Sequence, residues 1–428
     1  MYKKKKVVFV DGCRTPFLKS GSGYLNLMSY ELGQFAINGL LKNTGLDPKQ
    51  VDQVIMGTVI SNVKTSNVAR EAALGAGIPY SSPCQTVTQA CISSNRAICN
   101  AINEIKLDNA DIIIAGGVEN ISDTPIGFPK KMRNKLFAAQ KLKGFLDYIK
   151  FLSSLRPSDF IPVRPAVAEY FTGSTMGQDC DIMAARFDIS REAQDDFAFR
   201  SHQNAGKAQS ENILNEEICS VTFPPNFDTF SIDNGIRPQA NRKKLSKLRP
   251  AFDKKNGTLT AANSSFLTDG AAASLIASEE KALSLGLSPK SVIIAYTFTG
   301  QDLEDELLLG PTYAISKVLK IANMSLSQID VIELHEAFAG QVLANIKCLA
   351  SDSFAIEKLG RDSAVGKIDM NKLNTWGGSL SIGHPFGATG SRLLTTASNR
   401  LIKEEGRYAL ISACAAGAHG HAMIIEKY

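Results

Sequence analysis

Short segments rich in glycine and alanine surround several residues that could do chemistry, and Cys91 is the first of them. It lies in residues 89–95 (QACISSN), a small-residue turn predicted to open a helix that runs towards Ile105. A helix N-terminus offers free N–H groups and a positive dipole end, so we expect the pKa of the Cys91 thiol to be lowered. The segment favours a nucleophile, although a lone cysteine is more often a small buried hydrophobic residue.

Three later segments carry the other reactive candidates. His384 lies in a glycine-rich turn, residues 383–390 (GHPFGATG), where its imidazole could reach a thiol or a carbonyl oxygen. Cys414 comes just past a predicted strand, among residues small enough to let the backbone approach a ligand. His335 follows the predicted strand 331–334 in the segment HEAFA. Dinucleotide-binding, Walker and H-E-x-x-H patterns are missing from the sequence, which disfavours a nucleotide-binding fold and a zinc protease.

The elements that must position these residues occur twice. Residues 35–54 match residues 313–332 without a gap, and both stretches are typical of an amphipathic helix, a turn and a strand. A second pair, 96–115 and 392–412, follows in the same order. The sequence therefore predicts a duplicated α/β protein in which each half is a helix–sheet–helix unit with strands covered on both faces.

Between the repeats lies a stretch with no counterpart. Residues 130–156 contain eight Lys or Arg against the single acid Asp147. Apolar residues recur there at helical spacing, which predicts a basic amphipathic helix. We expect this helix either to pack on its own domain or to dock on a membrane surface or a partner subunit. Residues 190–220 are predicted to form a further helix and 223–257 an extended surface loop.

Composition limits the class of protein and the ligands that fit this chain. The chain has 428 residues, 44% of them hydrophobic and 21% charged, with a net charge of +5, which suits a phosphorylated small molecule as well as a nucleic acid. Its eight cysteines are scattered and its histidines number five, which argues against a structural zinc site and a disulfide scaffold. Residues 1–6 run directly into a predicted first strand, and apolar runs stay below the ~18 residues of a membrane span. A cytoplasmic protein is predicted.

Together the four reactive segments resemble the active-site blocks of the thiolase family, in the same order and spacing and over nearly the whole chain. His335 in place of the commoner Asn, the basic insert and residues 166–170 (AVAEY) resemble the thiolase (beta) subunits of trifunctional fatty-acid oxidation complexes. The resemblance implies a duplicated, layered αβαβα fold. Its N-terminal half would be 1–124 plus about 205–288, its inserted loop domain 125–204 and its C-terminal half 289–428.

The resemblance also implies a reaction. Cys91 would attack a medium- or long-chain 3-ketoacyl-CoA and form an acyl-enzyme, and Cys414 would act as acid and then as base towards CoA. His384 would activate Cys91 and, with a water held by His335, stabilise the thioester oxygen. The backbone N–H groups of Cys91 and Ala416 would form a second oxyanion hole.

For the substrate, the resemblance places Arg237 and Ser265 at the adenine and pantetheine parts of CoA. Met176 and Phe338 would line the acyl or pantetheine tunnel, although core packing explains them equally well. CoA is then a substrate, and no metal, permanently bound cofactor or nucleic acid is expected. The implied partners are a second copy of the chain and a hydratase/3-hydroxyacyl-CoA dehydrogenase (alpha) subunit.

Two departures from the family pattern leave alternatives open. Alanines stand at 416 and 418, where many thiolases have glycine after the second cysteine, and Thr175 replaces a His that is frequent in short-chain biosynthetic enzymes. The rival functions are a biosynthetic acetoacetyl-CoA acetyltransferase and a non-catalytic scaffold of a complex. A ketoacyl synthase would share the fold but lack a second catalytic cysteine, so Cys414 argues against it.

Overall fold

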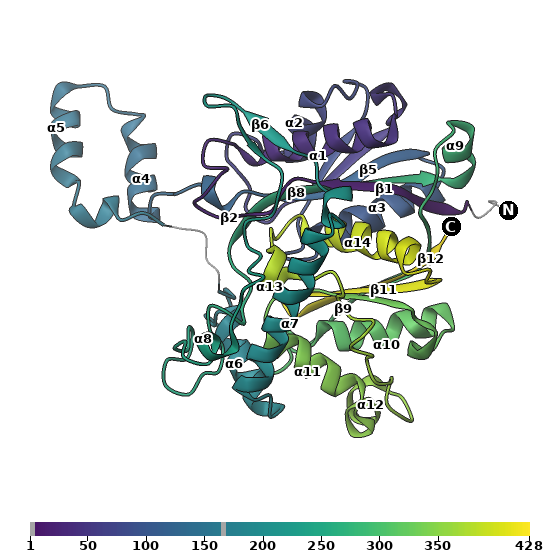
Figure 1. The fold of residues 1–428 in the computed structure, drawn as a ribbon. Coiled ribbons are helices and arrows are strands. Elements are labelled where there is room, and N and C mark those ends of the chain that lie inside the picture. The colour runs from purple at the N-terminus through teal and green to yellow at the C-terminus, as the bar shows by residue number, and fades with distance from the viewer. Residues whose placement is uncertain (1–4, 164–167) are drawn as a thin grey trace.

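The computed structural model describes residues 5–163 and 168–428 and is built around a mixed ten-stranded sheet (Figure 1). Residues 1–4, and Ala166 and Val167 of the AVAEY segment, lie outside the described residues. The strand order is β10-β11-β12-β9-β1-β8-β5-β3-β4, and the short β2 (Leu18–Lys19) pairs with β8. The bounds are β1 (Val7–Arg14), β3 (Gln53–Gly57), β4 (Cys84–Val87), β5 (Ile112–Glu119), β8 (Thr268–Ser278), β9 (Ser291–Gly300), β10 (Val331–Leu334), β11 (Tyr408–Ala415) and β12 (His419–Lys427).

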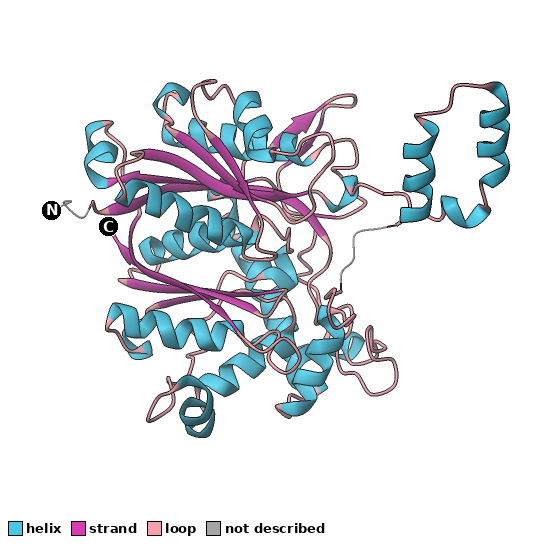
Figure 2. Ribbon diagram, turned by 180° about the vertical axis from the view of Figure 1, so that it is seen from behind, coloured by secondary structure: helices cyan, strands magenta, loops and turns pink. Residues whose placement is uncertain are grey.

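This sheet consists of two copies of one pattern. The order β1-β8-β5-β3 in the N-terminal half is repeated as β9-β12-β11-β10 in the C-terminal half. The halves join where β1 pairs with β9 through only two residue pairs, Val8 with Val292 and Phe9 with Ser291. The predicted duplication is therefore confirmed, and the two half-sheets lie over one another (Figure 2).

Helices complete five layers. The central layer holds α3 (Ser93–Lys106) and α14 (Thr389–Lys403), which pack against each other and against strands of both halves (Figures 1 and 2). The outer layers hold α1 (Ser29–Thr44) and α2 (Val68–Gly75) on one side, and α10 (Gly310–Ala322) and α11 (Ala339–Leu349) on the other. Because β5 and β8 are covered on both faces, every residue of these strands is buried. The αβαβα prediction is confirmed.

Equivalent helices of the two halves also end alike. The helix α1 ends at Gly45 with φ +67°, and α10 ends at Asn323 with φ +51°. Glycine and asparagine are the residues that adopt this left-handed conformation most readily, so the local sequence stops each helix at the same place. A short turn then leads into β3 or β10, as the repeated helix–turn–strand pattern predicts.

The basic insert differs from the expectation. It forms two helices, α4 (Lys130–Ala139) and α5 (Phe145–Ser154), where the sequence predicted one. Gly144 caps the start of α5 through the Asp147 carboxylate, and Leu142 falls in the turn. This helical hairpin projects away from the five layers (Figure 1), so the expectation that the helix packs on its own domain is wrong.

Two further boundaries also differ. The helix predicted over 190–220 is α7 (Arg191–Ser210), and the 223–257 loop contains β7 (Asp228–Phe230) and α8 (Arg242–Leu245). None of the helices in the described ranges combines the length and apolar character needed to cross a bilayer. The other elements are α6 (Met176–Arg186), β6 (Val221–Phe223), α9 (Glu279–Ser284), α12 (Asp352–Leu359), α13 (Ser379–Ile382) and the 3-10 turns Pro48–Gln50, Ile121–Asp123, Pro157–Phe160, Leu214–Glu216 and Leu326–Gln328.

Candidate active site

Cys91 lies in a tight turn between β4 and α3. Ala90 adopts φ +45°, which is uncommon for a residue with a side chain and turns the chain sharply at this point. The Ser93 hydroxyl fixes the turn, because it accepts the Gln89 N–H at 2.8 Å and donates to the Ala90 carbonyl at 2.7 Å. The helix begins at Ser93, so Cys91 precedes its first turn.

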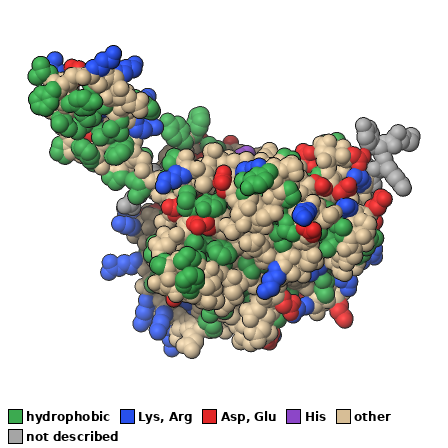
Figure 3. Space-filling view, turned by 90° about the horizontal axis from the view of Figure 1, so that it is seen from above, with side chains coloured by type: hydrophobic (Ala, Val, Ile, Leu, Met, Phe, Trp, Pro, Cys, Tyr) green, Lys and Arg blue, Asp and Glu red, His purple; other side chains and the backbone are tan. Residues whose placement is uncertain are grey.

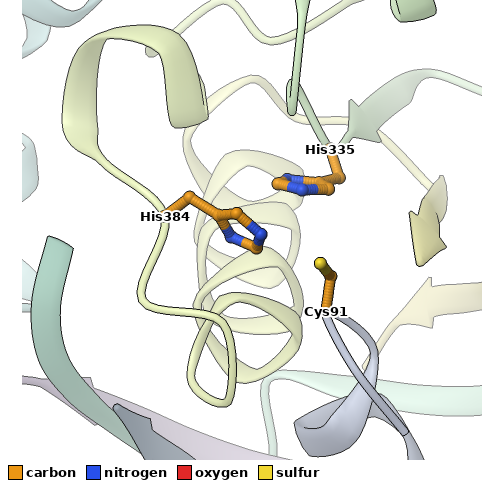
Figure 4. A group of neighbouring side chains, drawn as sticks. All are labelled: Cys91, His335 and His384. Atoms are coloured by element: carbon orange, nitrogen blue, oxygen red, sulfur yellow. The ribbon is translucent and has the colours of Figure 1, made fainter. Parts of the chain in front are cut away.

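His335 and His384 converge on this cysteine (Figure 4). The Cys91 Sγ and one ring nitrogen from each histidine all lie within 4.8 Å of one another. The ring centroids of the two histidines are 4.1 Å apart. Since the three residues come from separate chain segments, the five-layer packing is what brings the predicted group together.

The hydrogen bonds of His384 define which nitrogen faces the thiol. Its Nδ1 lies 2.6 Å from the Thr389 Oγ1, and that hydroxyl donates its proton to the Pro385 carbonyl at 3.0 Å. The hydroxyl must therefore accept from a protonated Nδ1, which leaves Nε2 unprotonated. This Nε2 is buried and has no hydrogen-bond partner among the described residues, so it can take a proton.

His335 adopts the opposite tautomer by the same reasoning. Its Nδ1 lies 2.9 Å from the Ser379 Oγ, which already accepts a hydrogen bond from Arg392 at 3.1 Å. Among the described residues this hydroxyl has no other acceptor for its own proton, so it is assigned as the donor to Nδ1, and Nε2 then carries the hydrogen and can donate. One imidazole therefore offers an acceptor and the other a donor to the same small space.

Burial keeps both imidazoles neutral. It lowers the pKa of His384 to about 3, with a further contribution from the positive charge of Arg392. Burial, followed by the charges of His384 and Arg392, also lowers the pKa of His335 well below its usual range. A neutral His384 is the form that can accept the Cys91 proton.

The expected lowering of the Cys91 pKa is wrong. Burial raises the pKa of Cys91 to about 11, although hydrogen bonds from the N–H groups of Ala416 and of Cys91 itself lower it. Desolvation outweighs the helix terminus because Cys91 stands before the helix begins. The resting group is a thiol, so it needs a base such as His384 to become a nucleophile.

Cys414 supplies a second buried thiol next to the first. It lies near the end of β11 rather than past it, and burial followed by the charge of Cys91 raises its pKa above the usual range. The backbone N–H groups of Ala416 and Cys91 both act to lower the pKa of the Cys91 thiol, so both lie near that sulfur, and their role as oxyanion donors stays a prediction. Gly417 at φ +78° and Ala418 at φ +54° close the turn. The turn thus keeps its bend although positions 416 and 418 hold alanine.

Of the predicted substrate contacts, three lie beside the catalytic group. Met176 and Phe338 pack in one apolar cluster with Cys414. Ser265 lies in a segment whose neighbours Ser264 and Leu267 bridge to Phe338 and His384. Arg237 is exposed, and its N–H donates to the Nδ1 of His202 at 3.2 Å. Thr175 accepts the Gln178 N–H and so caps α6.

Sequence reasoning missed the residues that hold the catalytic ones. Glu119, buried at the end of β5, accepts the N–H groups of Val59, Ile60 and Gly387 and so ties the His384 loop to the N-terminal half. Burial raises its pKa to about 7 in spite of these bonds. The sequence did offer one signal for Glu119, because a carboxylate at the end of an apolar strand needs hydrogen-bond partners. Nothing in the sequence pattern points to Ser379 or Thr389.

The thiol and two imidazoles could also hold a metal ion. Zinc accepts cysteine and histidine ligands, and three protein ligands leave a position open for water. The expectation that this chain binds no metal therefore stays a prediction.

Comparisons with known proteins agree with these observations. Residues 7–280 match the family described as "Thiolase, N-terminal domain", and 287–427 match "Thiolase, C-terminal domain". The chain is 51% identical to the mitochondrial trifunctional enzyme subunit beta of Bos taurus, over 99% of this chain and 89% of that protein. It is 42% identical to a 3-ketoacyl-CoA thiolase of Yersinia enterocolitica, over 98% and 97%.

A solved structure matches as well. Human mitochondrial 3-ketoacyl-CoA thiolase in complex with CoA superposes with a TM-score of 0.84 at 30% identity, over 99% of this chain and 98% of that one. Matches over both halves, together with 51% identity along almost the entire chain, establish that this protein belongs to the thiolase family.

Proposed function

We propose that this chain is a 3-ketoacyl-CoA thiolase, an acetyl-CoA C-acyltransferase that acts in fatty-acid β-oxidation. It cleaves medium- and long-chain 3-ketoacyl-CoA with CoA into acetyl-CoA and a shortened acyl-CoA. The observation that carries this proposal is the half-buried Cys91 thiol, which lies within 4.8 Å of a ring nitrogen of His384, with the buried Cys414 thiol beside it. The names of the bovine and Yersinia relatives support it.

In the first half-reaction, the His384 Nε2 takes the Cys91 proton and the sulfur attacks the 3-keto carbon. The bond between the 2- and 3-carbons breaks, and its electron pair leaves on the enolate of acetyl-CoA. Cys414 then donates its thiol proton to that carbon. Its raised pKa suits this step, because a thiol acid must still hold its proton when the carbanion develops.

In the second half-reaction, the Cys414 thiolate takes the proton of the CoA thiol. The CoA sulfur attacks the thioester, and the Cys91 sulfur leaves and recovers its proton from His384. The oxygen that becomes negative faces the N–H groups of Cys91 and Ala416, and His335 Nε2 supplies a further donor through a water. Each preorganised donor of this kind contributes about 3 kcal/mol to the transition state.

CoA is a substrate in this scheme. Ser265 and Met176 lie beside Phe338 at the catalytic group and are assigned to its pantetheine arm and the acyl chain. Arg237 is assigned to the adenine end, where an exposed cation is well placed for a phosphorylated ligand. The similar human thiolase was solved in complex with CoA, which supports CoA as the ligand of this site.

The test is CoA-dependent loss of 3-ketoacyl-CoA absorbance with a long-chain and a four-carbon substrate. Cleavage of the long chain supports the proposal. Reaction with the four-carbon substrate alone would assign the chain to the biosynthetic acetoacetyl-CoA acetyltransferases. No activity from a folded protein would favour the scaffold function.

The projecting hairpin is proposed to contact a membrane surface. Apolar side chains gather on it (Figure 3), with Phe145 80% and Phe137 67% exposed, and the basic residues of 130–156 surround them. Such a surface suits anionic lipid, where apolar contact and charge attraction add. Flotation with anionic vesicles should retain the protein and fail for Phe137→Ser/Phe145→Ser. Ile182→Ser, at an exposed apolar residue outside the hairpin, is the matched control.

Two subunit contacts are also proposed. The bovine relative is named a trifunctional enzyme subunit beta, so the implied partner here is a hydratase/3-hydroxyacyl-CoA dehydrogenase subunit. If the hairpin serves that partner instead, its serine variants should lose co-purification of the subunit and keep vesicle binding unchanged. A homodimer is expected through β4, because this edge strand pairs only with β3 in the part of the chain described here. Light scattering that finds only a monomer at all concentrations would contradict it.

The cellular compartment of the protein is also a proposal. The sequence predicts a cytoplasmic enzyme, whereas the bovine relative is named mitochondrial. Fractionation of the source cells, with the chain detected by mass spectrometry, distinguishes the two compartments.

A further inference from the structure

A closed loop between the hairpin and α6 reaches the catalytic thiols. Ala168 bridges to Thr175, the Glu169 N–H donates to the Ser174 carbonyl at 2.9 Å, and the Gly173 N–H donates to the Glu169 carbonyl at 2.8 Å. Tyr170 at the tip is fully exposed, whereas the Glu169 side chain is half-buried. The loop geometry therefore separates an outward tip from an inward carboxylate.

The Glu169 carboxylate contacts the turn that follows Cys414. Its Oε1 accepts the Gly417 N–H at 2.5 Å, across 248 residues of sequence. Gly417 comes directly after Ala416, whose N–H lies near enough to the Cys91 sulfur to lower its pKa. The position of one oxyanion donor thus depends on a backbone that Glu169 holds from the opposite side.

This turn has a particular need for an external support. Ala418 adopts a left-handed conformation at φ +54°, which costs energy for any residue with a Cβ. A charge-assisted bond from a carboxylate to a backbone N–H is among the stronger hydrogen bonds in proteins, so it can hold such a turn in place. Ala418, which stands where glycine is usual, and the Glu169 carboxylate are therefore two parts of one arrangement that shapes this turn.

We propose that Glu169 is a positioning residue for the thiolase reaction, acting by fixing the 415–418 turn so that the Ala416 N–H faces the acyl oxygen on Cys91. This inference rests on the proposed function. The carboxylate does not touch the reacting atoms, and its effect passes through the backbone of Gly417.

The same carboxylate acts on the charge of the nucleophile. Cys91 faces the carboxylates of Glu119 and Glu169, the neutral rings of His335 and His384, and the Cys414 thiol. Both carboxylates contribute to raising the pKa of Cys91, after burial. Removing the Glu169 charge should therefore ease ionisation of the thiol, which gives a readout separate from turnover.

The test compares Glu169→Gln with Glu169→Ala. Glutamine keeps an oxygen that can accept the Gly417 N–H, whereas alanine removes both the acceptor and the charge. We expect kcat of Glu169→Ala to fall about 10- to 100-fold, less than complete removal of a donor. Glu169→Gln should stay within about threefold of wild type for the same reason, with KM changed little in both. Glu192→Ala, at an exposed glutamate of α7, is the matched control.

Alkylation of Cys91 by iodoacetamide, followed by mass spectrometry across pH, is the second readout. Glu169→Gln should reach its half-maximal rate at lower pH than wild type. Equal kcat in wild type and Glu169→Ala, or equal losses in both variants, would overturn the proposal. If Glu169→Ala does not fold, Glu169→Asp, one methylene too short, should show the same loss. A wild type that alkylates normally but cleaves no 3-ketoacyl-CoA would refute the proposed function instead.

Discussion

The two halves of the molecule use one scaffold for different chemistry. Cys91 precedes α3 in the N-terminal half, and His384 precedes the equivalent helix α14 in the C-terminal half. The strand β5 ends in Glu119, which holds backbone N–H groups of neighbouring loops, whereas its equivalent β11 carries Cys414 near its end. Duplication thus provided two similar scaffolds, and different residues near the starts of the central helices and the ends of the equivalent strands divided the nucleophile from the acid and base.

The largest expected effect on activity comes from Cys91, the nucleophile in the N-terminal half. Cys91→Ala should reduce thiolysis by a factor on the order of 10⁴ or more, as loss of a nucleophile does in other enzymes. Steady-state assays with a long-chain 3-ketoacyl-CoA measure this. Cys99→Ala, a buried cysteine of the same half, is the control and should keep activity. Substantial turnover by Cys91→Ala would refute the division between the halves.

Loss of the C-terminal thiol should separate two steps. Cys414→Ala should lower thiolysis about 10³- to 10⁴-fold, because the enolate then lacks its acid. Transfer of an acyl group from a saturated acyl-CoA to Cys91 breaks no carbon–carbon bond and CoA can leave as a thiolate, so this step should be slowed much less and remain visible as an added mass. Cys180→Ala is the matched variant in the same apolar cluster. Equal loss of both steps would show that Cys414 is not specific to the acid–base role.

Disturbing the tautomer of His384 should reduce activity by an intermediate amount. Thr389→Val removes the acceptor of the Nδ1 proton of His384, and kcat/KM should fall about 10- to 100-fold, within the range of general base catalysis. Thr395→Val tests a buried threonine of the same helix whose hydroxyl, within the described part of the chain, donates to the Ser391 carbonyl alone. Equal kinetics for the two variants would refute the tautomer assignment.

Dependence on pH should be weak on the acid side. The pKa of His384 lies at about 3, so its ring stays neutral and able to accept a proton as the pH falls from 8 to about 5. kcat/KM should therefore show no decline centred near pH 6.5, the ordinary histidine value. A decline with that midpoint in the pH profile would mean that the imidazole is less buried than the structure has it.

Breaking the link between the halves should have the smallest catalytic effect. Glu119→Ala leaves three backbone N–H groups without their acceptor, and each unmet buried donor costs about 1–3 kcal/mol. We expect a lower free energy of unfolding, together with a kcat reduced less than tenfold. Thermal denaturation and steady-state assays measure the two effects. Unchanged stability would show that the His384 loop does not depend on the N-terminal half.

Much of this arrangement could be predicted from the sequence. The repeat of helix, turn and strand at 35–54 and 313–332 carried the duplicated fold, because apolar periodicity records which faces are buried. The four reactive segments pointed to Cys91, His335, His384 and Cys414, which the structure brings into one region.

What the sequence could not show depends on distances between remote segments. The tautomer of His384 depends on Thr389 and the carbonyl of Pro385, and the pKa of Cys91 on how completely the layers desolvate it. The Glu169 contact joins residues 248 positions apart. The placement of the hairpin was left open by the sequence, because its apolar stripe has the same pattern whether it packs inward or stays exposed.

The central claim is that Cys91 carries the acyl group. Wild-type protein incubated with a long-chain 3-ketoacyl-CoA without CoA, then digested and analysed by mass spectrometry, tests this directly. The account predicts a shortened acyl group on the peptide that contains Cys91, released when CoA is added. An acyl group on any other residue, or acetyl-CoA formed with no acylated peptide, would contradict it.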